Sequence, residues 1–172
     1  VAEVFEIVAN ANDEHIEIAK FWDCNPAPMI VGGHIMQVNR QNTPGGHWIG
    51  ITKIASKKSK LNLIETMEIL AKVGIAIADG FKAAWDTKYV YNFIRPESYI
   101  REKIDPDWQT KLETPLFPEY TSAHSLISAA AAAVLTDRFG ENFSYNDSTN
   151  VPFDLPARSF NSFWEAADEA AM

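Results

Sequence analysis

Two basic residues and a turn that contains a histidine carry the chemistry that this sequence suggests first. Lys88 and Arg95 stand seven positions apart, and a proline follows the arginine directly. Further along, residues 121–124 read Thr-Ser-Ala-His and open an alanine-rich run. Two cations, a hydroxyl, the backbone N–H groups of a helix start and a histidine are together what a tetrahedral oxyanion needs for binding.

The pair of cations also has an ordinary explanation, a basic edge in contact with solvent. If a helix continues through residues 85–94, the seven-residue spacing places Lys88 and Arg95 on one face. The residues between them are mostly aromatic or aliphatic, which predicts a buried stretch. Buried cations require an anionic partner, and Asp86 and Glu97 are the carboxylates nearest in sequence. We therefore expect an external anion as a further partner.

The turn at residues 121–124 has an ordinary explanation too, a plain helix cap. Thr121 or Ser122 would cap the helix, and His124 would be a polar residue of its first turn. In the functional interpretation, Ser122 donates its hydroxyl to the anion and Ala123 donates its backbone N–H. His124 titrates near neutrality, so it can act as a general acid on a leaving oxygen or stabilise bound peroxide.

The elements that must position these residues are predicted to be helical. Apolar residues at three- and four-residue spacing predict helices over residues 1–23 (interrupted at 10–13), 47–58, 61–84, 121–138, and from about 157 onwards. Residues 85–94 continue the third helix or restart it, and Pro96 ends it. Residues 26–46, 98–120 and 142–156 are predicted loops, with at most a short helix at 105–108. The fold class is an all-α bundle of about five to seven helices.

Composition narrows the class of protein. A chain of 172 residues with 47% hydrophobic residues can bury the core of one domain. Its net charge of -8 argues against nucleic acid as a partner, and no apolar run approaches the ~18 residues of a membrane span. Because the chain begins at Val1 and stops within a helical pattern, we expect residues 1–172 to be a single domain from a longer parent. The single cysteine, Cys24, is expected to be buried and apolar in character rather than nucleophilic.

The other histidines show no metal-ligand spacing. His15 is predicted on a solvated helix face, and His34 is expected to have a structural role in a loop. His47 is a candidate for lining a substrate site, with helix capping or packing as its alternative. Glu119 is a second candidate for lining that site. No Gly-x-Ser-x-Gly elbow or nucleotide-binding glycine loop is present.

The order of the two motifs resembles that of a known superfamily. Lys-x6-Arg-Pro followed by Phe-Pro-x-x-x-Ser-small-His-Ser is similar to the type 2 phosphatidic acid phosphatases and vanadium haloperoxidases. The resemblance to the bacterial haloperoxidase-related branch extends over residues 80–135. It rests on Ala-Trp-Asp-x-Lys-Tyr around Lys88 and on Pro-Leu-Phe-Pro-Glu-Tyr, which leads into the histidine turn. The resemblance implies a helical bundle whose pocket accepts phosphate or vanadate, because both are tetrahedral oxyanions that can become five-coordinate.

The resemblance also implies roles for individual residues. Lys88 and Arg95 would hold equatorial oxygens, while Ser122 and the Ala123 amide would add hydrogen bonds. His124 would protonate the leaving alkoxide in a phosphatase or assist peroxide binding in a haloperoxidase. Vanadate would be the cofactor in the second case, and no cofactor would be needed in the first. Each such donor typically contributes on the order of 3 kcal/mol to catalysis.

Two departures from the family pattern stand out. The usual Pro-Ser-Gly-His has become Thr-Ser-Ala-His, and alanine at the glycine position costs about 1 kcal/mol only if that position needs a positive φ. We expect the milder case, because a first helical turn tolerates alanine. The family continues with Ser-Arg-x5-His, whose arginine clamps the anion and whose histidine is the phosphatase nucleophile or the vanadium ligand. Arg158 and Ser159 do not match this motif, because no histidine follows them.

Two hypotheses therefore compete. In the first, the chain is the oxyanion-binding domain of a bacterial phosphatase or haloperoxidase that acts on a small molecule, and the resemblance implies export, as is common among such relatives. In the second, it is a catalytically inert helical piece that needs a missing segment or a second chain to complete its site. An exposed apolar face would then promote homo-oligomers.

Overall fold

The computed structural model describes residues 1–24, 29–32, 35–38 and 42–172, and the described part is mainly helical. Its helices are α1 (Ala2–Ala9), α2 (Asp13–Trp22), α3 (Pro44–Lys58), α4 (Leu63–Tyr91), α5 (Pro96–Lys103), α6 (Ala123–Phe139) and α7 (Phe163–Glu169). Two short antiparallel pairs accompany them: β1 (Met29–Gly32) with β2 (Ile35–Val38), and β3 (Tyr145–Asp147) with β4 (Arg158–Phe160). The predicted all-α bundle is confirmed.

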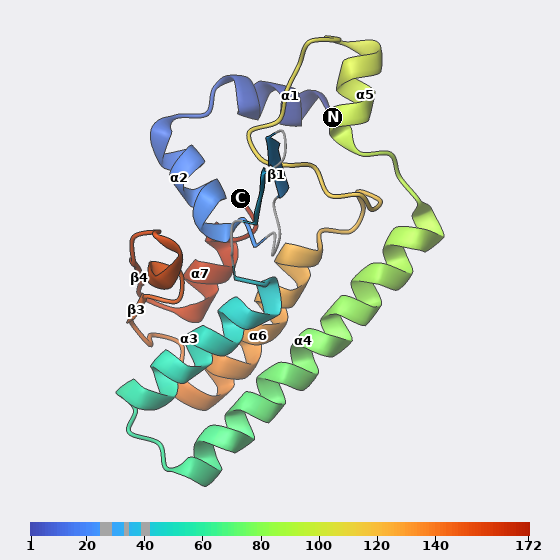
Figure 1. The fold of residues 1–172 in the computed structure, drawn as a ribbon. Helices are drawn as coiled ribbons and strands as arrows, with labels where there is room; N and C mark the ends of the chain where they lie inside the picture. The colour runs from blue at the N-terminus through green and yellow to red at the C-terminus, as the bar shows by residue number, and fades with distance from the viewer. Residues whose placement is uncertain (25–28, 33–34, 39–41) are drawn as a thin grey trace.

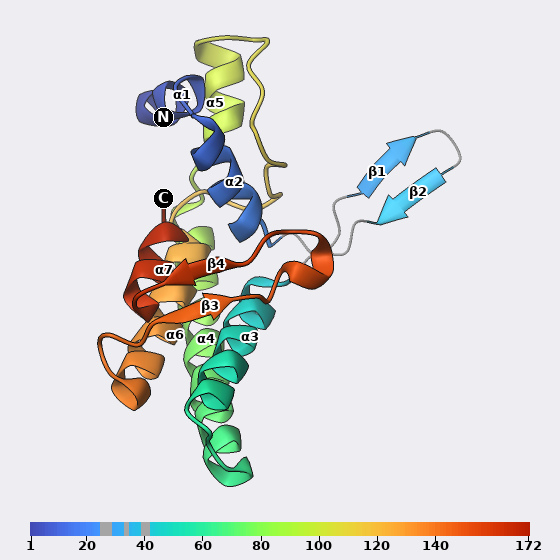
Figure 2. The ribbon, with the colours of Figure 1, turned by 90° about the vertical axis from the view of Figure 1, so that its left-hand side faces the viewer.

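The long helix α4 runs along one side of the molecule, with α3 and α6 beside it (Figure 1). Helix α7 packs on α6, and the β3–β4 pair lies next to α3 and α7 (Figure 2). The β1–β2 pair stands away from the helices in the same view. Helices α1, α2 and α5 gather at the end of the molecule where α4 finishes (Figure 1), which is also the end that carries Lys88.

Local signals explain the unusual length of α4. Asn62 and Glu65 form a capping box, in which each side chain accepts from the other's backbone N–H at 3.0 Å. The helix then continues without a break for 29 residues, so of the two alternatives for residues 85–94 it is continuation that the structure shows, as far as Tyr91. It ends at Asn92, whose φ of 50° is left-handed, a conformation that asparagine tolerates better than most residues.

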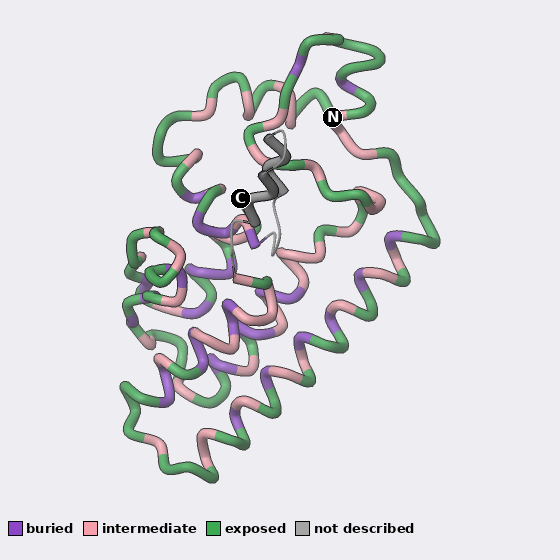
Figure 3. The backbone as a smooth tube through the Cα atoms, in the orientation of Figure 1, coloured by how far each residue is buried: buried purple, intermediate pink, exposed green. Residues whose placement is uncertain are grey.

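One core holds the described helices together. The buried apolar residues of this cluster come from α2, α3, α4, α6, α7 and the β3–β4 pair, and they include Phe21, Trp22, Trp48, Ile51, Val73, Leu135, Phe160 and Phe163. The buried positions face inward along α3, α4 and α6 (Figure 3). At Gly80, α4 and α6 approach so closely that an added Cβ would lie 2.8 Å from Leu126 Cδ2. A side chain at position 80 would therefore require Leu126 to move.

Four predictions of local structure were wrong. Parts of the predicted loops 26–46 and 142–156 form β1, β2 and β3, because strands of three or four residues are too short for a period-two pattern to be recognised. Strand β4 occupies Arg158–Phe160, where the last helix was predicted to begin, and α7 starts only at Phe163. A helix occupies residues 96–103 instead of 105–108, and Pro96 starts it at the position where a missing N–H costs nothing. The side chains at positions 89–91, 93 and 94 are exposed rather than buried.

Among the described residues, no helix combines the length and the apolar character needed to cross a bilayer.

Candidate functional site

Lys88 is a fully buried cation near the end of α4. Its Nζ donates to the carbonyl oxygens of Pro118 at 2.8 Å and Glu119 at 3.0 Å, and it lies 5.0 Å from the centre of the Phe117 ring. Burial lowers the pKa of Lys88, the charge of Arg95 lowers it further, and the charge of Glu119 opposes both. An ammonium has three N–H donors, so one remains for a ligand.

Arg95 reaches the same ring from a different element. Because Asn92 ends α4, Arg95 lies beyond the helix, and the prediction of a shared helical face was wrong. Its Cζ nevertheless lies 5.7 Å from the centre of the Phe117 ring, over which Lys88 is also placed. The Nε of Arg95 is buried and has no hydrogen-bond partner within the described part of the chain. The two cations therefore converge, and each keeps an N–H donor that the described residues do not use.

Glu119 supplies the carboxylate that was expected from Asp86 or Glu97. Its Oε2 lies 3.0 Å from Nη1 of Arg95, as an ion pair rather than an aligned hydrogen bond. Glu97 contacts Arg101 instead, at 3.3 Å. The expectation was wrong because it considered only carboxylates close in sequence, whereas the loop that contains Glu119 folds back onto the end of α4.

Ser122 is the N-cap of α6, and one of the two predicted caps is thereby confirmed. Its Oγ accepts from the backbone N–H of Ser125 at 3.2 Å and from the Ser125 hydroxyl at 2.8 Å. The hydroxyl proton of Ser122 is not used in these contacts, and the side chain is exposed. Ala123 is the first residue of the helix, where backbone N–H groups lack intrahelical partners.

His124 extends from the first turn of α6 toward the N-terminal segment. Its Nε2 is buried and unbonded among the residues that the structure describes. Burial lowers the pKa of His124, and the charge of His47 lowers it further. Asp23 and a hydrogen bond with the backbone of Trp22 act in the opposite direction. At neutral pH the imidazole is therefore mainly neutral, able to accept one proton.

Acid is expected to destabilise the wild-type chain more than a His124→Asn variant. The pKa of His124 is lowered from 6.5 in the folded chain, so the unfolded chain binds this proton first as the pH falls. The stability contributed by the neutral imidazole is complete above pH 6.5 and is lost as the pH falls through the folded value. Urea unfolding at neutral and at mildly acidic pH measures the difference. An equal loss in both proteins would contradict this assignment.

His47 lies in the interior, next to residues that no sequence signal had connected to it. It is 1% exposed, and its Nε2 lies 2.7 Å from Oδ2 of Asp147. Its ring stacks on Trp22, with centroids 4.6 Å apart. Asp147 also accepts from Thr149, through the backbone N–H at 3.0 Å and the hydroxyl at 2.6 Å. The pair was missed because 100 positions separate its members and Asp147 lies in a predicted loop.

Cys24 is buried beside His47, and its Sγ lies 3.8 Å from Nδ1 of that ring. Burial raises the pKa of the thiol to about 12, and the charges of Asp23 and Asp147 add to the effect. The expected apolar character is consistent with this environment. At pH 8 the folded chain should hold roughly a thousandfold less thiolate than the unfolded chain. Labelling by a thiol reagent should therefore be slow until urea is added, and rapid labelling of the folded chain would contradict this burial.

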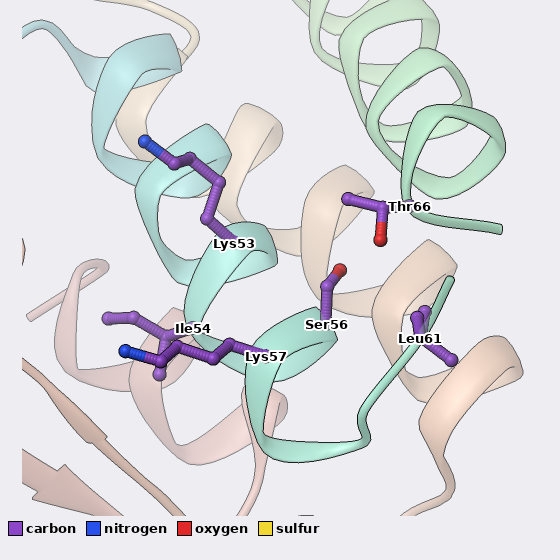
Figure 4. A pocket seen from close by; sticks show the side chains of 6 residues that line it. All are labelled: Lys53, Ile54, Ser56, Lys57, Leu61 and Thr66. Atoms are coloured by element: carbon purple, nitrogen blue, oxygen red, sulfur yellow. The ribbon is translucent and has the colours of Figure 1, made fainter. Parts of the chain in front are cut away.

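A separate hollow lies between the end of α3 and the start of α4 (Figure 4). Its lining residues are Lys53, Ile54, Ser56, Lys57, Leu61 and Thr66. The Ser56 hydroxyl is already used, because it donates to the Thr52 carbonyl at 2.8 Å. Thr66 and Lys88 are 22 positions apart on α4, which corresponds to about 33 Å at ~1.5 Å per residue. The hollow is therefore remote from the cations.

The structure arranges the predicted site residues in two groups. Lys88, Arg95 and Glu119 meet at the Phe117 ring, whereas His124 and His47 lie near Trp22. Within the described residues, no hydrogen bond or ion pair joins the side chains of the two groups directly. The segment 117–124 connects them along the chain, because Pro118 and Glu119 accept from Lys88 and His124 lies at the other end of the segment.

The other candidate residues that the structure describes do not extend the site. Arg158 makes a bidentate pair with Glu169, at 2.8 Å and 2.7 Å, so its guanidinium is already engaged. His15 is exposed on α2, as predicted. His34 lies outside the described residues. Among the described residues, no group of three potential ligand side chains could hold a metal ion.

Comparison with known proteins assigns the chain to a family. Residues 68–172, more than half of the chain, match the family described as the VCPO second helical-bundle domain. The chain is also similar to a crystal structure described as that of the first bacterial vanadium-dependent iodoperoxidase, with 47% identity and a TM-score of 0.89. That match covers 99% of this chain and 40% of the iodoperoxidase chain. No curated protein matches. The chain therefore belongs to the family that carries the VCPO second helical-bundle domain.

Proposed function

We propose that this chain forms part of a vanadium-dependent haloperoxidase and supplies one side of its oxyanion pocket. The observation that carries the proposal is the convergence of Lys88 and Arg95 on one ring, with Nε of Arg95 buried and lacking a hydrogen-bond partner among the described residues. A buried donor of this kind is costly unless a ligand uses it. A tetrahedral oxyanion is the ligand class that two cations at a helix start fit best.

The donor set fits vanadate and phosphate alike. Lys88 offers a point charge, Arg95 a planar guanidinium, and the turn before α6 offers the Ser122 hydroxyl and the Ala123 N–H. Together these groups would neutralise the anion and hold it against the first turn of α6. His124, mainly neutral at pH 7, would accept or return a proton at its imidazole. Vanadate, when bound, would supply the centre at which peroxide is activated for halide oxidation.

The similarity to the vanadium-dependent iodoperoxidase favours haloperoxidase over phosphatase activity for the parent protein. Iodide is accordingly the first halide to test, and a small oxidisable molecule is the expected class of final acceptor. Phosphate would bind to the same groups as a competitor. One core with contributions from α2, α3, α4, α6 and α7 supports treating residues 1–172 as one domain.

A second candidate function is an incomplete helical unit that binds no oxyanion alone. It is supported by the chemistry of the described histidines, because His47 is held by Asp147 and His15 is exposed on α2. The vanadium-ligating histidine of the family pattern would then have to come from another segment or a second chain. Exposed apolar residues on α4, such as Ile64, Met67 and Ile75, would promote association in that case.

A calorimetric titration of orthovanadate into this chain separates the two candidate functions. The proposal predicts saturable binding that inorganic phosphate displaces, because both anions would use the same donors. Light scattering in parallel reports whether the chain is a monomer at the concentration used. Absence of binding to a folded monomer would overturn the proposal and favour the incomplete unit.

A further inference from the structure

Glu119 contacts both cations of the proposed pocket. Its carbonyl oxygen accepts from Nζ of Lys88 at 3.0 Å, and its carboxylate lies 3.0 Å from Nη1 of Arg95. Its backbone N–H donates to the carbonyl of Phe93 at 3.0 Å, which fixes the residue against the segment between the two cations. A single residue of the 117–122 loop thus links the end of α4 to the start of α5.

The side of the guanidinium that Glu119 contacts is informative. Arginine binds oxyanions best through two parallel N–H groups, and the pair formed by Nε and Nη2 is one such edge. In this structure Glu119 contacts Nη1, while Nε is buried and finds no hydrogen-bond partner in the described part of the chain. A carboxylate that occupied the anion's place would bind the Nε edge. Glu119 instead contacts Nη1, and the Nε donor remains unused by the described residues.

We propose that Glu119 is a positioning residue, whose carboxylate holds Arg95 by Nη1 so that the Nε–Nη2 edge stays directed at the oxyanion. The inference rests on the proposed function, because it assumes that Arg95 binds that anion. The physical reason is preorganisation. An arginine side chain loses considerable rotamer freedom when it is fixed, and fixing it before the anion arrives removes that cost from binding.

Simple electrostatics predicts the opposite effect, which makes the inference testable. A carboxylate beside a bound anion repels it, so removal of Glu119 raises affinity if charge alone matters. Removal lowers affinity if orientation of Arg95 matters more. The two accounts therefore differ in the sign of a single measured change.

The experiment is a double-mutant cycle on vanadate affinity with Glu119→Ala, Arg95→Lys and the double variant. Lysine keeps the positive charge but has no planar fork to orient. We expect Glu119→Ala alone to weaken binding about tenfold, the equivalent of one lost charge-assisted hydrogen bond. In the Arg95→Lys background, the same substitution should cause no further loss. Glu68→Ala removes an exposed glutamate that pairs with Lys72 on α4. It is the matched control and should leave the affinity for vanadate unchanged.

Two results would overturn the inference. Tighter binding by Glu119→Ala would make the carboxylate a competitor of the anion. An equal loss in both backgrounds would mean that the substitution disturbs the loop in general rather than the orientation of Arg95.

A measurement without any anion keeps this inference separate from the proposed function. In the wild-type chain, the side-chain Nε–H of Arg95 should give a sharp, slowly exchanging NMR signal because Glu119 restrains the guanidinium. The Glu119→Ala substitution should broaden that signal or speed its exchange. An unchanged signal would refute the positioning role. A wild-type chain that shows the restrained signal but binds no vanadate would refute the proposed function alone.

Discussion

Replacing Arg95 by alanine is expected to reduce the affinity of this chain for vanadate by about a hundredfold, which makes binding undetectable in a routine titration. The substitution removes the one guanidinium that meets Lys88 over the Phe117 ring, and with it the buried Nε donor. Calorimetry measures the change. Arg101→Ala is the matched control, because it removes an exposed arginine that pairs with Glu97 on α5.

Lys88→Met should have a comparable effect on binding. Methionine keeps the length of the buried stem but removes the charge and the donors that contact the 117–122 loop. Lys82→Ala on the exposed side of α4 controls for loss of a lysine. Vanadate affinity that stays unchanged in the Arg95 or Lys88 variant, with the fold intact, would contradict the assignment of the pocket.

The second large effect concerns stability. Asp147→Ala is expected to lower the free energy of unfolding by about 3–5 kcal/mol, the usual range for removing one partner of a buried pair. The substitution leaves Nε2 of His47 without its acceptor in a fully buried environment, and it removes the acceptor of both donors of the half-buried Thr149. Urea denaturation measures this loss.

Two variants make the stability result specific. Asp147→Asn keeps an acceptor oxygen and should lose clearly less stability than Asp147→Ala. Asp79→Ala removes an exposed carboxylate from α4 and should stay within ~0.5 kcal/mol of the wild type. If Asp147→Ala behaves like Asp79→Ala, the buried pair does not stabilise the fold.

Much of the helical architecture could be predicted, because each helix carries its own local signals. The break between α1 and α2, the capping residue Ser122 and the stop at Gly140 all follow from residue types within one or two turns. The loop that leads into the predicted turn is bonded to the predicted cation Lys88 through the carbonyl oxygens of Pro118 and Glu119.

What could not be predicted depends on contacts between distant segments. The pairing of His47 with Asp147 and the return of Glu119 to Arg95 arise from packing, which leaves no periodic pattern in the sequence. The expected burial of residues 89–94 failed for a different reason. Apolar composition was taken as a sign of burial, yet a large share of any folded surface is apolar, so composition alone does not locate a side chain.

NMR can locate vanadate on the chain through the backbone and arginine side-chain N–H signals, and this tests the oxyanion pocket itself. Saturable shifts that phosphate reverses are expected at Lys88, Arg95 and residues 117–124, with the signals of Lys53 and Lys57 at the remote hollow unchanged. Shifts at the hollow, or no shifts in a folded chain, would contradict the claim that these two segments form an oxyanion pocket.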